Sequence, residues 1–103
     1  MKLFGFIVLA IVMVFFAAPA LAAGVTQVQM KDFKFQPDHI TVKAGDKVTW
    51  TNMDPAPHDV KFKDFESPNM NKGEQYSKTF DRPGTYDYMC EIHPYMKGQV
   101  VVQ

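Results

Sequence analysis

From Val25 to the end of the chain, the sequence is divided into short runs in which apolar and polar residues alternate. Alternation with a period of two is typical of half-buried β-strands, and no segment keeps the spacing of an amphipathic helix. Gly, Pro, Asn and Asp separate the runs, as in the segments 44–46, 54–57 and 81–84. We therefore predict strands near residues 26–30, 34–35, 40–43, 47–52, 59–62, 75–80, 84–90 and 98–102.

The same alternation assigns one face of each run to a core, because successive side chains of a strand point to opposite faces. About eight short strands with regular turn signals predict an all-β fold, an antiparallel sandwich of seven to eight strands with crossing, Greek-key connections. The segment 64–72 is the least regular, and a loop or a helical turn would fit it. The predicted core residues are Ile40, Val42, Val48, Trp50, Val60, Phe62, Tyr76, Phe80, Tyr86 and Tyr88.

Residues 1–22 have the pattern of a secretory signal peptide. Lys2 precedes an apolar run over residues 3–16, and the segment ends in the small residues of an Ala-x-Ala sequence at Ala22. Cleavage there would export residues 23–103 to the periplasm as a single domain. The alternative is an uncleaved membrane anchor, because residues 3–23 are just long enough to cross a bilayer.

Cys90 is the only cysteine of the sequence, which excludes an internal disulfide. A domain of about 80 residues buries limited apolar surface, and small exported domains often depend on disulfides or on a bound metal. An unpaired thiol in an oxidising compartment also tends to oxidise unless it is buried or ligated. Both arguments favour a metal bound at Cys90.

The residues around Cys90 offer such a site. His93 and Met96 follow it in one short loop, each separated from the preceding candidate by two residues. A thiolate, imidazole and a weak thioether suit copper, and two histidines with one cysteine form the blue-copper arrangement. His58 can supply the second histidine from a strand beside that of Cys90.

Two other kinds of site use the same residue types. A structural zinc ion also binds thiolate and imidazole, although the thioether of Met96 is a poor ligand for zinc. A cysteine enzyme built on Cys90 and His93 would need a third residue that orients the base, and the sequence shows no clear one.

The segment Pro57-His58-Asp59-Val60 and the segment 84–96 resemble the cupredoxin family, as does the scaffold run 35–52. The Cys-x-x-His-x-x-Met spacing is most similar to amicyanin and is shorter between His and Met than in plastocyanin. The resemblance spans nearly all of residues 23–103.

This resemblance implies a cupredoxin-like β-sandwich that binds one copper ion in a type 1 site. His58, Cys90 and His93 would be the strong ligands and Met96 the long axial ligand. The implied function is a soluble, monomeric electron carrier, not an enzyme, whose redox partners dock transiently near His93, Pro94 and Tyr95. The alternative is a periplasmic copper chaperone or buffer that uses the same ligands.

Two positions depart from the family pattern. Asp59 stands where the family often has an asparagine that helps to fasten the cysteine loop, and an ionised carboxylate accepts hydrogen bonds but does not donate them. Met89 replaces a tyrosine that plant plastocyanins carry on a partner surface. The formal net charge is zero, and no basic stripe indicates a nucleic-acid partner.

Overall fold

The computed structural model describes residues 23–103, and this part of the chain contains eight strands and no helix. The predicted signal peptide, residues 1–22, lies outside the described residues. Between residues 23 and 103 there is no helix long and apolar enough to cross a membrane. The strands are β1 (Val25–Lys31), β2 (Lys34–Gln36), β3 (His39–Val42), β4 (Asp46–Asn52), β5 (Lys61–Phe62), β6 (Gln75–Phe80), β7 (Gly84–Met89) and β8 (Lys97–Val102).

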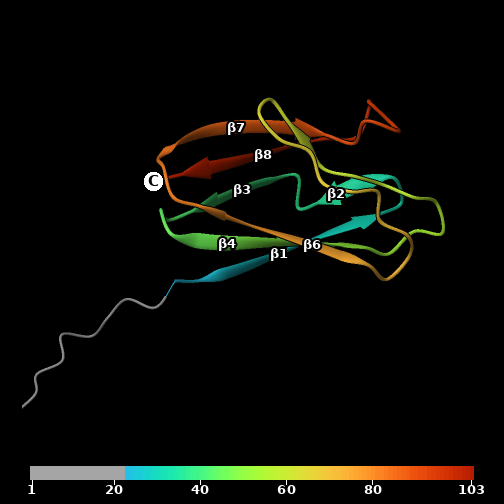
Figure 1. The fold of residues 1–103 in the computed structure, drawn as a ribbon, viewed down its shortest axis with the longest axis horizontal. Coiled ribbons are helices and arrows are strands. Elements are labelled where there is room, and N and C mark those ends of the chain that lie inside the picture. The colour runs from blue at the N-terminus through green and yellow to red at the C-terminus, as the bar shows by residue number, and fades with distance from the viewer. Residues whose placement is uncertain (1–22) are drawn as a thin grey trace, which may run out of the picture.

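The strands form two four-stranded sheets that pack face to face. One sheet has the order β2-β1-β4-β6, and the other has the order β3-β8-β7-β5. Figure 1 shows the two layers from the side, with β7 and β8 in one layer and β1, β4 and β6 in the other. The predicted two-sheet β-sandwich is therefore confirmed.

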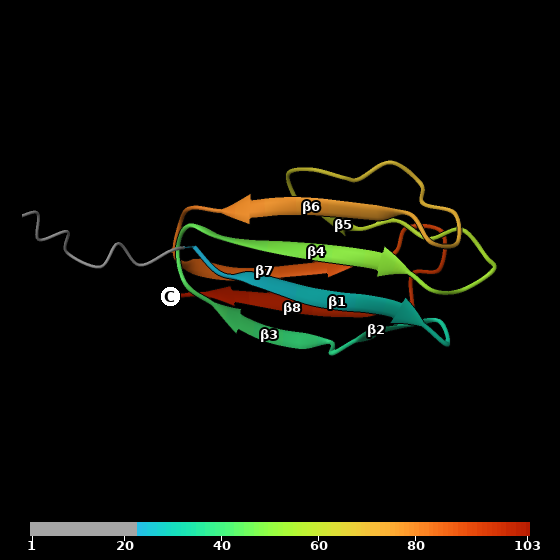
Figure 2. The same ribbon diagram turned by 90° about the horizontal axis from the view of Figure 1, so that it is seen from below.

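The pairing within each sheet is mixed, so the predicted antiparallel pairing holds for four of the six strand pairs and not for the other two. Strand β1 runs parallel to β4 and β3 runs parallel to β8, while the remaining pairs are antiparallel. Between β2 and β3 the chain continues in one direction while it passes from the first sheet to the second (Figure 2). This crossing lets β4 return to the first sheet beside β1 and parallel to it, whereas two consecutive hairpins would place β4 beside β2.

Trp50 lies at the centre of the core between the two sheets. Its ring packs against the aromatic rings of Phe62, Phe80 and Tyr88, and its Nε1–H donates a hydrogen bond to Tyr88 Oη over 3.1 Å. The predicted core residues are buried except for Tyr76 and Tyr86, which are half-buried against the core. The period-two alternation therefore identified the inward faces.

Strand β5 is shorter than predicted, because it begins at Lys61 and not near Asp59. The backbone of His58 pairs with Met70, with N···O distances of 3.1 and 2.7 Å, and Val60 N–H donates to Ser67 Oγ over 2.8 Å. These contacts direct the residues before Lys61 toward the segment 64–72 and away from β7. That segment is a loop.

Candidate metal centre

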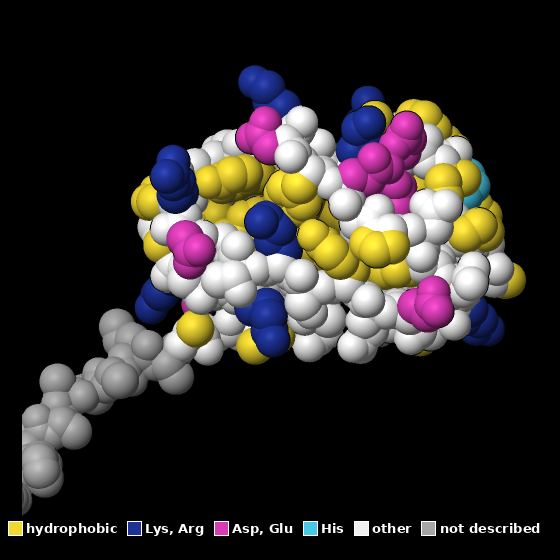
Figure 3. Space-filling model, in the orientation of Figure 1, with side chains coloured by type: hydrophobic (Ala, Val, Ile, Leu, Met, Phe, Trp, Pro, Cys, Tyr) yellow, Lys and Arg dark blue, Asp and Glu magenta, His cyan; other side chains and the backbone are white. Residues whose placement is uncertain are grey.

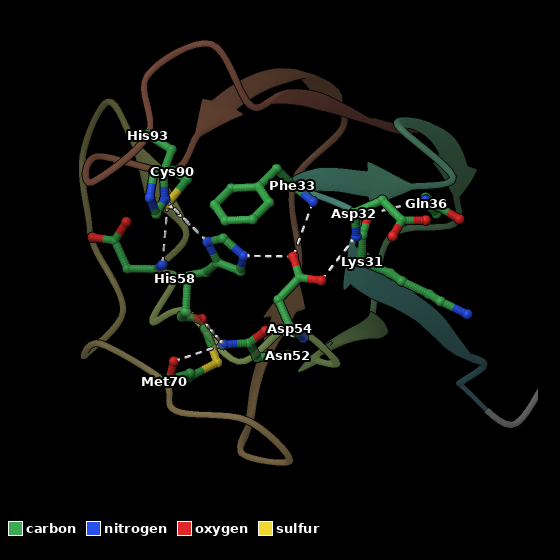
Figure 4. A network of polar contacts seen from close by, with 12 residues as sticks. Lys31, Asp32, Phe33, Gln36, Asn52, Asp54, His58, Met70, Cys90 and His93 are labelled. Carbon is green, nitrogen blue, oxygen red and sulfur yellow. Dashed lines mark hydrogen bonds and ion pairs between the residues drawn. The ribbon is translucent and has the colours of Figure 1, made fainter.

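Three potential metal ligands meet at the end of the sandwich where β1, β4 and β7 finish. His58 follows the proline-rich turn after β4, Cys90 comes directly after β7, and His93 lies in the loop that leads to β8. His58 Nδ1 is 3.2 Å from His93 Nδ1, and Cys90 Sγ is 3.7 Å from each of these two nitrogens. Figure 4 shows the three side chains pointing toward one another. The structure thus brings together His58, Cys90 and His93, as the sequence predicted.

These separations fit one metal ion. With the bond lengths known for zinc, about 2.0 Å to nitrogen and about 2.3 Å to sulfur, three donors in a plane lie about 3.5 to 3.7 Å apart. The observed separations of 3.2 and 3.7 Å are close to these values. The donor set of one thiol and two imidazoles, with a thioether in the same loop, suits copper.

The loop from Cys90 to Met96 is closed by its own backbone. Cys90 N–H donates to the Met96 carbonyl over 3.0 Å, and Met96 N–H donates to the His93 carbonyl over 2.8 Å. Met96 is only 2% exposed, so its side chain is packed inside the protein. The predicted fourth ligand therefore belongs to a tight loop that also carries Cys90 and His93.

The environment of Cys90 keeps the free thiol protonated. The side chain is completely buried, and this burial raises the pKa of the Cys90 thiol above its usual value. The Asp59 backbone N–H points at the sulfur, with an N···S distance of 3.5 Å, and acts in the opposite direction. Because metals bind the thiolate, loading of this site must release the thiol proton.

Asp59 fastens the cysteine loop in spite of being a carboxylate. Its Oδ1 accepts a hydrogen bond from Glu91 N–H over 2.7 Å, and the side chain is 1% exposed. An asparagine would make the same contact through its oxygen, so this tether needs only an acceptor. The departure from the family pattern at Asp59 therefore leaves the acceptor half of the tether intact.

Sequence reasoning missed the residues that hold His58. His58 Nε2 lies 2.8 Å from Asp54 Oδ2, and both side chains are buried. Burial alone would raise the pKa of Asp54, but the hydrogen bonds from His58 and from two backbone amides hold it below its usual value. The signal in the sequence is weak, because an aspartate four residues before a histidine also suits an ordinary turn.

Phe33 is the second residue that sequence reasoning missed. Its ring packs edge-on against His58 and His93, with ring centroids 5.1 and 4.9 Å apart. Phe33 is distant from both histidines in the sequence, so no local pattern points to this contact.

His93 is half-buried, while its neighbours are open to solvent. Tyr95 is 67% exposed, and Ile92 and Met53 are each 41% exposed. In Figure 3, hydrophobic side chains gather at the end of the molecule that shows a histidine. This end therefore presents an apolar surface around the only half-buried ligand candidate.

Known proteins have sequences and an architecture similar to those of this chain. The family described as cupredoxin-like domain matches residues 5–102. Amicyanin-alpha of Methylorubrum extorquens is 47% identical over 88 residues, which cover 79% of this chain and 74% of that protein. Plastocyanin of Scenedesmus fuscus is 40% identical over 84 residues, which cover 67% of this chain and 86% of that protein.

Solved structures agree with the sequence matches. An amicyanin mutant in its Cu(I) form has a TM-score of 0.75 at 42% identity, with 85% of this chain and 90% of that chain covered. Another amicyanin mutant, in the oxidised state, has a TM-score of 0.76 at 41% identity over the same shares of the two chains. On the sequence match, the sandwich and the histidine and cysteine cluster at its end, the chain belongs to the cupredoxin-like domain family.

Proposed function

We propose that this protein is a blue copper electron carrier in which His58, Cys90, His93 and Met96 bind one copper ion. The observation that carries the proposal is the approach of His58 Nδ1, His93 Nδ1 and Cys90 Sγ to within 3.2–3.7 Å of one another. Bound copper supplies a one-electron couple between Cu(II) and Cu(I). The related amicyanin structures include Cu(I) and oxidised forms, which supports the same couple here.

The protein's own residues make this site suitable for electron transfer. His58 and Cys90 are completely buried, and the loop of Cys90 is closed by backbone hydrogen bonds and by Asp59. Donors that are fixed before the metal binds need little rearrangement when its charge changes. We propose a carrier and not an enzyme, because Cys90 and His93, the pair that a cysteine enzyme would use, converge with His58 on one site and would be occupied by the metal.

The partners in this proposal are redox proteins that dock transiently, as donor and acceptor, near His93, Pro94 and Tyr95. The exposed side chains of Tyr95, Ile92 and Met53 make this end apolar, and small apolar surfaces suit short-lived complexes. The half-buried His93 would be the route for the electron. We expect the carrier to be a monomer.

The proposal also includes export. Residues 1–22 act as a signal peptide, and the mature domain of residues 23–103 works in the periplasm. A lone thiol that is ligated by copper is protected from oxidation in such a compartment.

A periplasmic copper chaperone would use the same four ligands but would release the metal to a partner. The complete burial of His58 and Cys90 favours permanent binding, because release would require the loop to open. Slow copper exchange together with a reversible one-electron couple would exclude the chaperone.

The visible absorption spectrum of the mature protein after addition of Cu(II) tests the electron-carrier proposal. We expect an intense thiolate-to-copper band that gives a blue solution, and we expect Cys90→Ser to abolish it. His39→Ala is the matched control, because His39 is exposed on β3 and far from the site in sequence. A colourless protein, or a blue band that survives in Cys90→Ser, would contradict the proposal.

A further inference from the structure

Asp54 has three hydrogen-bond partners that belong to two parts of the chain, the turn at Asp32 and Phe33 and the ring of His58. Its Oδ1 accepts from Asp32 N–H over 2.8 Å, and its Oδ2 accepts from Phe33 N–H over 2.9 Å. Oδ2 also lies 2.8 Å from His58 Nε2. Figure 4 shows the carboxylate between the histidine ring and the turn. One buried side chain therefore joins a metal-ligand candidate to the turn between β1 and β2.

The turn has a backbone conformation that needs such support. Asp32 and Phe33 have φ values of 55° and 56°, the left-handed conformation at both central positions of a two-residue hairpin turn. A bulky aromatic residue rarely adopts this conformation. This conformation directs the two adjacent amide N–H groups to one side, where both donate to the Asp54 carboxylate. These hydrogen bonds offset the conformational free energy that the left-handed turn costs.

The contact with His58 determines which ring nitrogen carries the proton. A carboxylate accepts hydrogen bonds, so the short contact with Asp54 requires a proton on His58 Nε2. The other nitrogen, Nδ1, is then left with a free lone pair. Nδ1 is the atom that lies 3.7 Å from Cys90 Sγ.

We propose that Asp54 is a positioning residue that fixes the proton of His58 on Nε2, directs Nδ1 at the metal and thereby favours Cu(II) over Cu(I). This inference rests on the proposed copper function. A carboxylate that accepts the N–H of a ligand imidazole makes that imidazole a stronger donor, and the more highly charged ion gains more from it. The same carboxylate accepts the backbone N–H of Phe33, whose ring packs against the imidazoles of His58 and His93. Asp54 therefore positions both a ligand candidate and the aromatic ring that contacts it.

The reduction potential of Asp54→Asn tests this role. We expect the preference of the site for Cu(II) over Cu(I) to fall about tenfold, which raises the potential of a one-electron couple by about 59 mV. The blue band should remain, because all four ligands are present. Asp54→Glu retains the charge and should restore part of the lost preference.

Asp46→Asn is the matched control. Asp46 also accepts two backbone hydrogen bonds, from Gly24 N–H and Lys43 N–H, but it lies at the start of β4 and contacts no histidine. Its substitution should leave the potential unchanged. Equal potentials in Asp54→Asn and Asp46→Asn would overturn the positioning role, whereas a missing blue band in the unsubstituted protein would overturn the copper function itself.

A measurement on the unsubstituted protein covers the case in which Asp54→Asn does not fold. In the Cu(I) form, nuclear magnetic resonance should detect the His58 Nε2 proton as slowly exchanging with water, because its acceptor is buried. The exposed pair of His39 and Asp38, with a 3.0 Å contact, is the internal reference. A His58 proton that exchanges as fast as those of His39 would overturn the inference.

Discussion

Gly98 of β8 lies opposite Tyr88 of β7, and the absence of a side chain at this position gives the Tyr88 ring its place. A Cβ atom built on Gly98 would lie 2.5 Å from Tyr88 Oη. That hydroxyl accepts the hydrogen bond from Trp50 Nε1, and burial raises the pKa of Tyr88 above its usual value. The glycine therefore serves to position the buried Tyr88 and Trp50 pair, and not to allow an unusual turn.

We predict that Gly98→Ala destabilises the metal-free protein by about 1–3 kcal/mol, because the rigid Tyr88 ring must move within a packed core. Urea denaturation followed by tryptophan fluorescence measures this loss. Gly24→Ala is the control, because its Cβ would meet Asp46 at an ordinary contact distance of 3.5 Å. Equal stability of the two variants would show that the core tolerates the added methyl group.

At the scale of elements, the metal centre depends on how the loops beyond β4 are held. Asn52, the last residue of β4, is completely buried and bonds three loop positions. Its Nδ2 donates to the carbonyls of Ala56 and Met70, each over 2.8 Å, and its Oδ1 accepts from Asp54 N–H over 2.8 Å. Met70 in turn pairs with the backbone of His58, so Asn52 fixes both loops that carry or flank this histidine.

Asn52→Ala should lower the free energy of unfolding by on the order of 3 kcal/mol, since it leaves three polar groups without partners, two of them in buried bonds. It should also weaken copper binding, because the loops around His58 loosen. The neighbouring substitution Thr51→Ala removes only an exposed hydrogen bond with Gln75 and should change stability by less than about 0.5 kcal/mol. Thermal unfolding with and without copper separates the two effects, and a loss of similar size in both variants would refute the assigned role of Asn52.

At the scale of the whole molecule, the formal net charge is zero, but acidic groups cluster locally beside the candidate metal centre. Carboxyl oxygens of Asp59, Glu66 and Glu91 lie within 4.8 Å of one another. The hydrogen bond that the single O–H of protonated Glu66 donates, to Asp59 or to Glu91, raises the pKa of Glu66 to about 7, and the two negative charges act in the same direction. Lys61 is the cation that faces this cluster, 3.5 Å from Glu91.

This cluster predicts how stability changes with pH. The folded state binds the Glu66 proton more tightly than the unfolded state, so its stabilising contribution is complete below about pH 4.5 and is lost as the pH rises through about 7. The pKa values of Asp38 and Asp46 are lowered, Asp38 by its contact with His39 and Asp46 by backbone N–H groups, so their contributions are lost when the pH falls below about 4.

Glu66→Gln should therefore flatten the loss of stability between pH 5 and pH 8 and should make the metal-free protein more stable than the unsubstituted chain at pH 8. Urea denaturation at several pH values measures the difference in stability between the two proteins, so that contributions common to both cancel. Glu74→Gln removes a carboxylate outside the cluster and should keep the original slope. Parallel stability curves for Glu66→Gln and the unsubstituted chain would disprove this prediction.

The sequence by itself determined the strands, the inward faces and the ligand loop. The strands and the core follow from a period-two pattern, which depends only on neighbouring residues along the chain. The approach of Cys90 to His93 has a similar local origin, because two residues separate them in a loop that its own backbone closes.

Only the tertiary structure decided how His58 is held and where the chain crosses from one sheet to the other. The contacts of His58 with Phe33, of Asp59 with Glu91 and of Asp54 with the turn at Asp32 each join residues more than 20 positions apart. The parallel pairing of β1 with β4 likewise depends on the crossing between β2 and β3. No local pattern encodes such pairs, because a hydrogen bond or ring contact between distant segments exists only after the two sheets have packed.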